Sequence, residues 1–489
     1  MNSSQNSFVR LTNYFLVAIC VVGCATAFAQ ASSITAAIIR TETSSCSRIC
    51  TSRQADAVEP DSLNQRLDEV ASSFTKDDAF MGAVLVARDN TILFDKAYGK
   101  AVLEWNIPNS PDVKFRIGSM TKQFTAALIL LAQEAGKLSV DAPVRKYLPD
   151  APAAWEKITI ADLLHHTSGI TNFIFDKRYF EWRMVSRTPA EEVALFKDKS
   201  LNFSPGTQWE YSNSNYTLLG MILEKVTGRR YVDLLRERIL APLGMKDSGL
   251  DDDDLILPKR AEGYQPGPKG IVPMRSLSMS VGWSTGSMYS TTADLLRWEQ
   301  GLFGGKVLSA SSLKQMTTPG KGNYGDGVFV SRKDDIEVVE HGGSIDGFNS
   351  YMIYVPARNI AVIVLSNVSG DAPDKMAAKL LDVTLGKAVS LAKPRIALPI
   401  SRAELSKFVG DYEISAQLSL KIAASDDGLI VQASGQPPLA FAYEGEINGH
   451  PQFFTRAMDV QIEFIPTSAN HVSTLVLHLG GSAMQGRRQ

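Results

Sequence analysis

Cysteine is scarce in this chain: the 489 residues include four, and all of them precede residue 51. The rest of the chain therefore offers no disulfide, no thiolate nucleophile and no cysteine-ligated metal. Cys46 and Cys50 could close a small loop in an oxidising compartment, or could belong to an unstructured spacer rich in serine and threonine.

A surplus of charge of either sign is also missing, because 50 basic side chains stand against 52 acidic ones. Proteins that bind nucleic acid usually carry a basic surplus or stripe, so nucleic acid is not an expected partner. No segment after the N-terminal region is long and apolar enough to predict a transmembrane helix. Hydrophobic residues make up 44% of the chain, which is enough for a packed core, and the length predicts two domains.

The first thirty residues are typical of an export signal. A basic residue precedes an apolar run over residues 14–23, and small residues precede a cleavage site after Ala29. An alternative is a lipobox that ends at Cys24, which would leave a lipidated cysteine and a membrane anchor. We expect a periplasmic or extracellular protein, with a signal peptide over 1–29 and a linker over 30–60.

Two differently patterned segments follow this N-terminal region. Residues 61–388 begin with a helical pattern, continue with a strand pair near residues 83–94 and a long helical middle, and close with two strands and a helix. This order predicts an α+β fold, in which terminal helices cover one face of an antiparallel sheet and an all-helical lobe is inserted. After a proline-containing linker at 389–400, short alternating strands over 401–489 predict a small all-β, barrel-like domain.

One of several Ser-x-x-Lys matches has the context of a catalytic pair. Ser119 follows a glycine and precedes an apolar helical run over residues 124–132. We therefore expect it at a helix N-terminus, where free N–H groups favour a developing negative charge. Lys122 lies three residues on, hence on the same face and within reach of the hydroxyl. A serine becomes nucleophilic when a base takes its proton, and a lysine can do so when burial lowers its pKa.

Tyr211 and Asn213 form a second candidate cluster, which follows a Pro-Gly turn. A phenol near Ser119 and Lys122 could pass a proton to the leaving group. A carboxamide could orient both the lysine and a substrate amide.

The third cluster consists of His341, Gly342, Gly343 and Ser344, just before a pair of apolar strands. Two glycines would let a substrate backbone approach the edge of a strand closely. The backbone N–H of Ser344 could then join that of Ser119 in an oxyanion hole.

In this order and spacing, the three clusters resemble those of the serine β-lactamase and penicillin-binding-protein superfamily. The resemblance is to its class C β-lactamase-like branch in particular, which includes DD-peptidases, esterases and D-amino-acid peptidases, and it covers nearly all of residues 62–388. It implies a β-lactamase/transpeptidase-like fold and an acyl transfer that uses neither metal nor cofactor. Segments 410–412 and 435–437 are similar to a lipocalin-like C-terminal domain often fused to such hydrolases. The expected catalytic residues are Ser119, Lys122 and Tyr211, and the expected substrate-binding residues are Asn213, His341, Gly342, Gly343 and Ser344.

The third cluster departs from the pattern that this resemblance implies, because β-lactamases commonly carry lysine where this chain has His341. Histidine is mostly neutral near pH 7, so a permanent anchor for a substrate carboxylate is missing. Efficient β-lactam hydrolysis is therefore not expected, whereas acylation of Ser119 by a β-lactam stays open.

The sequence thus predicts a serine acyl hydrolase that acts through a Ser119 acyl-enzyme on small esters or D-amino-acid-containing peptides. Two alternatives stay open: a β-lactamase proper, and a non-catalytic sensor that binds penicillin or peptidoglycan. The expected partner is a small ester, peptide or β-lactam substrate, with peptidoglycan as a further candidate. The residues do not decide whether Lys122 or Tyr211 is the general base, because the pair titrates as one unit.

Three competing motifs are weaker. The segment 282–286 matches the nucleophile elbow of α/β-hydrolases around Ser284, but a preceding strand and an immediately following helix are not predicted. The segment 320–325 matches a dinucleotide-binding fingerprint without a surrounding βαβ unit, so we expect a loop. His165 and His166 could suggest a metal, but no third ligand has suitable spacing.

Overall fold

The computed structural model of the protein describes residues 60–76, 79–267, 270–274, 277–415, 418–434, 438–456, 460–468, 471–479 and 482–489. The expected signal peptide, the four cysteines Cys20, Cys24, Cys46 and Cys50, and the segment 435–437 lie outside the described residues. Within the described ranges, we find no helix with the length and apolar character needed to cross a membrane.

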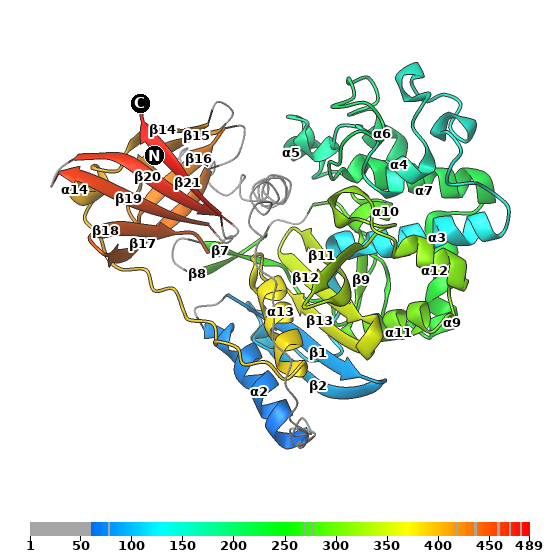
Figure 1. Ribbon diagram of the computed structural model, residues 1–489, viewed down its shortest axis with the longest axis horizontal. Coiled ribbons are helices and arrows are strands. Elements are labelled where there is room, and N and C mark those ends of the chain that lie inside the picture. Colours follow the sequence, from blue (N-terminus) through cyan, green and yellow to red (C-terminus); the bar gives the residue numbers. More distant parts are fainter. Residues whose placement is uncertain are drawn as a thin grey trace, which may run out of the picture.

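A six-stranded antiparallel sheet, in the order β10-β11-β12-β13-β1-β2, forms the centre of the larger part of the molecule (Figure 1). Its N-terminal strands join its C-terminal ones, because β1 pairs with β13 and places Val84 opposite Val364. The turn between β1 and β2 has positive φ at both Asp89 and Asn90, which is the conformation of a tight two-residue hairpin. The strands are β1 Gly82–Arg88, β2 Thr91–Tyr98, β10 Phe329–Lys333, β11 Ile336–Ile345, β12 Phe348–Val355 and β13 Ile360–Ser366.

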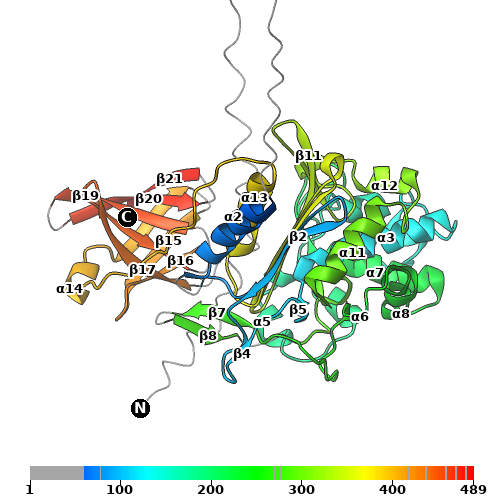
Figure 2. The same ribbon diagram turned by 90° about the horizontal axis from the view of Figure 1, so that it is seen from below.

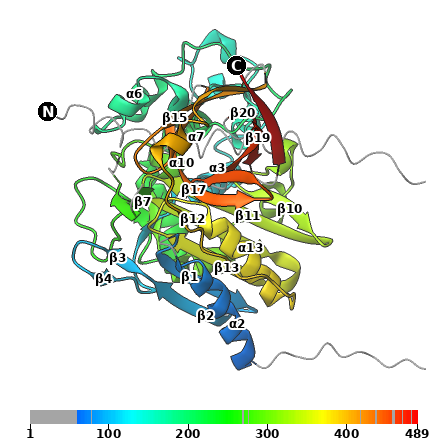
Figure 3. The same cartoon turned by 90° about the vertical axis from the view of Figure 1, so that its left-hand side faces the viewer.

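Helices cover both faces of this sheet, and alternate residues of each strand contact opposite layers. On β1, Val84 belongs to the hydrophobic cluster formed with α2 (Pro60–Ser73) and α13 (Ala372–Thr384). Its neighbour Leu85 belongs to the cluster formed with the helical lobe. Figures 2 and 3 show α2 and α13 side by side on one face of the sheet, with the lobe on the other.

Helix α3 (Thr121–Glu134) runs through the centre of the helical lobe, and its residues 121–132 are all buried. A helix without an exposed face must be enclosed by its neighbours, here chiefly α7 and α10, together with α8 and α12. This enclosure fixes the position of Lys122, in the first turn of α3.

The other helices are α4 Ile160–Leu164, α5 Tyr179–Trp182, α6 Pro189–Val193, α7 Asn213–Thr227, α8 Tyr231–Leu235, α9 Ala241–Leu243, α10 Trp283–Gly286, α11 Thr292–Phe303 and α12 Ala310–Met316. The short strands here are β3 Lys100–Val102, β4 Ile107–Pro108, β5 Phe115–Arg116, β6 Gly249–Leu250, β7 Tyr264–Gly267, β8 Gly270–Pro273 and β9 Met288–Ser290.

The C-terminal part is a closed eight-stranded barrel, β14 to β21, which α14 (Arg402–Leu405) precedes. An extended segment over residues 387–400 connects it to α13. The structure therefore confirms the predicted α+β fold followed by a small β-barrel. The barrel strands are β14 Gly410–Ser415, β15 Leu418–Ala424, β16 Leu429–Ala433, β17 Pro438–Ile447, β18 His450–Phe454, β19 Val460–Ser468, β20 His471–Leu479 and β21 Ser482–Arg488.

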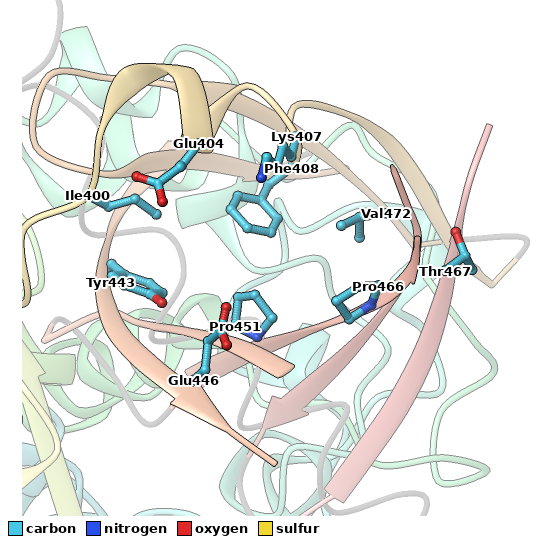
Figure 4. A pocket seen from close by; sticks show the side chains of 10 residues that line it. All are labelled: Ile400, Glu404, Lys407, Phe408, Tyr443, Glu446, Pro451, Pro466, Thr467 and Val472. Atoms are coloured by element: carbon cyan, nitrogen blue, oxygen red, sulfur yellow. The ribbon is translucent and has the colours of Figure 1, made fainter. Parts of the chain in front are cut away.

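One end of the barrel opens into a cavity of about 350 Å³ (Figure 4). Phe408 and Tyr443 line it with aromatic rings, and Glu404, Lys407 and Glu446 add charged groups. Ser119 and the other predicted site residues do not line this cavity.

Removal of residues 401–489 should leave a folded core, because the buried side chains of the barrel form a cluster of their own. That cluster shares no residue with those on the two faces of the sheet. We expect the truncated protein to be monodisperse in size-exclusion chromatography and to unfold cooperatively when heated, as followed by circular dichroism. Aggregated or molten protein would show instead that the core needs the barrel in order to fold.

Candidate active site

Ser119 lies in a 3-10 helix, η3 (Gly118–Met120), directly before α3. This is the helix-start position that the sequence predicts. Ser119 is partly exposed and lines a cavity of about 130 Å³. Its hydroxyl is thus accessible from the cavity, whereas the residues that follow it are buried.

Lys122 is fully buried, and its amino group contacts three oxygen atoms. Nζ lies 3.1 Å from Ser119 Oγ, 2.8 Å from Asn213 Oδ1 and 2.9 Å from the carbonyl oxygen of Thr285. The amide and carbonyl oxygens can only accept hydrogen bonds, so they occupy two N–H groups of the lysine. A neutral amine has two N–H groups and one lone pair. The lone pair is therefore left for the hydroxyl proton of Ser119.

The electrostatic surroundings also favour a neutral amine. Burial lowers the pKa of Lys122 well below its usual range, and the carboxylate of Glu192 opposes this shift in part. The neighbouring His166 is buried as well, and burial together with Lys122 keeps its pKa well below the usual range. The neutral imidazole of His166 and the neutral amine of Lys122 can lie close together, whereas two cations would repel each other.

Tyr211 and Asn213 lie beside Lys122, as the sequence predicts. The Nζ atom of Lys122 is 4.8 Å from the centroid of the Tyr211 ring. Asn213 is the first residue of α7 and holds Lys122 through its side-chain oxygen. Both residues line the same cavity as Ser119, so the two clusters meet in one site.

The Gly343–Ser344 end of β11 runs directly against η3. A Cβ atom on Gly343 would come 1.9 Å from the carbonyl oxygen of Ile117, and one on Gly118 would come 2.7 Å from the Ser344 nitrogen. Only glycine fits at both positions, and Gly118 also has a positive φ of 53°. This close approach places the backbones of Ser119 and Ser344 at the wall of one cavity, which is the placement that the predicted oxyanion hole requires.

His341 is a buried residue of β11. Its side chain is 2% exposed and is not part of the cavity wall. Nδ1 lies 2.5 Å from the carbonyl oxygen of Gly342, so it donates, and Nε2 accepts a hydrogen bond from Tyr324 Oη at 3.0 Å. Burial, reinforced by Lys122, lowers the pKa of His341 to about 3. The imidazole is thus a buried group that packs behind Tyr211, whose ring centroid is 6.4 Å away, and its contact with a substrate stays a prediction.

The rest of the cavity wall is mainly apolar. Among its described residues, the charged side chains are those of Arg183 and Asp346, which form a bidentate ion pair at 2.9–3.0 Å. The two side chains are 8% and 4% exposed, so each charge is largely neutralised by the other. The apolar residues of the wall are Phe173, Ile174, Leu277, Val281 and Ile345.

The competing motifs have structural roles. Ser284 is fully buried in the four-residue helix α10, and its hydroxyl donates to the carbonyl oxygen of Tyr216 at 2.9 Å. His165 forms an ion pair with Asp326 at 2.9 Å. No group of three or more His, Cys, Asp or Glu side chains within the described ranges is arranged to hold a metal ion.

Sequence reasoning missed two contributors to the site. The carbonyl oxygen of Thr285, next to the rejected nucleophile Ser284, accepts a hydrogen bond from Lys122, and a backbone acceptor carries no sequence signal. Glu192 acts on Lys122 from α6, where its neighbour Glu191 forms a capping box with Thr188. The adjacent acidic residues look equivalent in the sequence, and only the fold distinguishes the buried one.

Comparison with known proteins agrees with this geometry. The family model described as Beta-lactamase matches residues 67–385. Penicillin-binding protein 4* of Bacillus subtilis (strain 168) is 26% identical over 436 residues, which cover 84% of this chain and 95% of that protein. The D-amino acid amidase of Ochrobactrum anthropi SV3 is 26% identical with a TM-score of 0.57, over 66% of this chain and 98% of its own. The octameric penicillin-binding protein homologue of Pyrococcus abyssi shares the fold, with 24% identity and a TM-score of 0.60 over 86% and 99% of the chains.

The fold and the Ser119–Lys122 pair thus define a serine hydrolase with the β-lactamase/transpeptidase architecture. Because the family model matches well over half of its length, the chain belongs to the beta-lactamase family. This family includes relatives described as penicillin-binding proteins and as a D-amino acid amidase.

Replacing Lys122 with Met should lower kcat by a factor on the order of 10²–10⁴, the usual contribution of a positioned base. It should also change how stability depends on pH. Lys122 is protonated in the unfolded chain up to its ordinary pKa, but its pKa is depressed in the folded protein. The wild type therefore gains stability as the pH rises between these two values, and K122M should lack that gain.

Denaturant unfolding of both proteins at a series of pH values measures this effect. Lys137→Met is the matched control, because Lys137 follows the same helix and is exposed, so its curve should run parallel to that of the wild type. Parallel curves for K122M and the wild type would contradict the buried neutral amine.

Proposed function

We propose that this protein hydrolyses small esters, or amides and peptides of D-amino acids, through an acyl-enzyme at Ser119. The observation that carries the proposal is the hydrogen bonding of Lys122. Two of its three oxygen partners can only accept, so the lone pair of the neutral amine is directed at Ser119 Oγ. A base held this way activates the hydroxyl as a nucleophile.

In the acylation step, Ser119 Oγ attacks the substrate carbonyl carbon while its proton moves to Lys122. The backbone N–H groups of Ser119 and Ser344 stabilise the resulting oxyanion. The carbonyl then re-forms, and the leaving group departs with the proton that Lys122 took. We assign the final transfer of this proton to Tyr211, because the lysine lies 4.8 Å from its ring centroid.

In the deacylation step, a water molecule attacks the ester carbonyl of the acyl-enzyme. A base must take one proton from this water, and Ser119 Oγ must receive a proton as it leaves. We assign the first task to Tyr211, which lines the cavity and passes its own hydroxyl proton to the neutral Lys122 as it accepts the proton of the water. Lys122 then gives this proton to Ser119 Oγ. The two residues thus exchange protons in both half-reactions.

The cavity wall supports neutral substrates with an apolar acyl group. Its charged side chains, Arg183 and Asp346, neutralise each other, and His341 is buried and uncharged. A substrate carboxylate therefore meets no uncompensated cation on the described wall, which argues against efficient β-lactam hydrolysis. The similarity to a D-amino acid amidase supports D-configured amides as candidates.

Ser119→Ala should lower ester hydrolysis by a factor on the order of 10⁴ or more and abolish labelling by a fluorophosphonate. Ser284→Ala is the control, because it removes a buried hydroxyl from the adjacent helix α10. We expect it to cost about 1 kcal/mol of stability and to leave most of the activity. Mass spectrometry of the labelled protein locates the adduct. An adduct at Ser284 would overturn the assignment, and a stable Ser119 adduct without turnover of any substrate would indicate a sensor.

Substrate preference separates the hydrolase from a β-lactamase. We expect kcat/KM for p-nitrophenyl acetate and for D-phenylalanine amide to exceed that for nitrocefin by about tenfold or more. A charge-assisted hydrogen bond that the wall lacks is worth about 1.5–3 kcal/mol. L-phenylalanine amide is the stereochemical control. Faster hydrolysis of nitrocefin than of all neutral substrates would favour the β-lactamase alternative.

A further inference from the structure

Glu192 is a buried carboxylate close to the site but outside the cavity wall. It lies in α6, and its side chain is 3% exposed. Its neighbour Glu191 is exposed and accounts for the capping box of the helix. Helix capping therefore does not explain why Glu192 is inside, and burying a carboxylate has a substantial desolvation cost.

The contacts of Glu192 connect it to both elements that hold Lys122. The Thr217 hydroxyl donates a hydrogen bond to Glu192 Oε1, and Thr217 lies one helical turn after Asn213 on α7. The backbone N–H of Gly282 also donates to the carboxylate. The carbonyl oxygen of Gly282 in turn accepts hydrogen bonds from the backbone nitrogen of Thr285 at 2.5 Å and from its Oγ1 at 2.7 Å.

Asn213 and Thr285 supply the two fixed acceptors of Lys122. Glu192 therefore ties together the two segments on which the direction of the lysine lone pair depends. Loss of the carboxylate would leave the Gly282 N–H without this acceptor and would loosen the turn that carries Thr285.

Charge is the second link between Glu192 and the site. Burial raises the pKa of Glu192 to about 7, against the effects of Thr217, Gly282 and Lys122. The carboxylate and the lysine interact electrostatically, and the carboxylate raises the pKa of Lys122. The phenol of Tyr179, on α5, also lies within the electrostatic reach of Glu192. The other titratable groups that face Lys122 are His166, His341, Tyr211 and Tyr216.

We infer that Glu192 is a positioning residue of this site, which holds the two acceptors of Lys122 in place and stabilises the protonated form of the lysine. The inference rests on the proposed acyl transfer, in which Lys122 becomes an ammonium group when it takes the proton of Ser119. The negative charge of Glu192 stabilises that ammonium group. The lysine returns to neutral when the proton leaves with the leaving group, so no net charge accumulates.

Glu192→Gln tests two effects of Glu192 by different readouts: its negative charge, which acts on Lys122, and its hydrogen bonds, which position the acceptors of Lys122. Without the negative charge, Lys122 loses its proton more easily, and the acid limb of kcat/KM should move to lower pH by roughly half a unit or more. The hydrogen bond from the Gly282 N–H to residue 192 should also weaken, so that the turn carrying Thr285 is less well positioned and kcat falls by about tenfold. A merely structural role would lower the rate without moving the pH profile.

Glu299→Gln is the matched control. Glu299 lies on α11, is also 3% exposed, and has a pKa that burial raises to about 8. Lys122 is not among the groups that act on it. This variant should carry a similar change in burial and charge, yet leave the acid limb where it is in the wild type.

Thr217→Val is a second variant, in case E192Q does not fold. It keeps the carboxylate but removes a hydrogen bond that lowers the pKa of Glu192. The carboxyl group of Glu192 then stays protonated to higher pH. The acid limb of kcat/KM should therefore shift in the same direction as in E192Q, but by less. Thr217→Ser keeps the hydroxyl and should behave like the wild type.

The readouts are the pH profile of p-nitrophenyl acetate hydrolysis and the rate of fluorophosphonate labelling, with the adduct located by mass spectrometry. An unchanged acid limb in folded E192Q, or an equal shift in E299Q, would overturn the inference about Glu192. Absence of a Ser119 adduct in the wild type would overturn the proposed function itself. The two failures are therefore distinguishable.

Discussion

The burial of one amino group, that of Lys122, is the constraint on which the rest of this structure depends. Taking an amine out of water is costly, and the cost is offset only where every polar partner is in place. Its partners come from positions 3, 91 and 163 residues away in the chain. The enclosed helix α3, the start of α7 and the turn of α10 must therefore all assemble before the site exists.

Other features of the fold keep the site free of an excess of positive charge. His341 and His166 are buried beside the lysine, and their pKa values are lowered. The ion pair of Arg183 and Asp346 contributes no net charge to the cavity wall. A neutral base and a largely apolar wall suit an uncharged ester or amide, whereas an anionic substrate would find little to hold its carboxylate.

The parts of the site that follow from local geometry were predictable from the sequence. Ser119 and Lys122 are three residues apart at a helix start, and this spacing alone places them in contact. The strands of the sheet follow from alternation and apolar runs, as β1 and β13 show. The orientation of His341 was not predictable, because its burial depends on Tyr324 from a segment that the sequence describes only as a loop. The burial of Glu192 was not predictable for a similar reason, since its hydrogen-bond partners lie on two other elements.

The protonation state of Lys122 is the most direct test of this account. NMR of the protein labelled with ¹⁵N at the lysine side chains can follow each Nζ as the pH changes, and K122M identifies the signal of interest. The account predicts a neutral amine at pH 7 in the resting protein, with an ammonium signal appearing only as the pH is lowered. An ammonium signal for Lys122 that persists from pH 7 up to pH 9 would contradict it, because the lone pair would then not be available to Ser119.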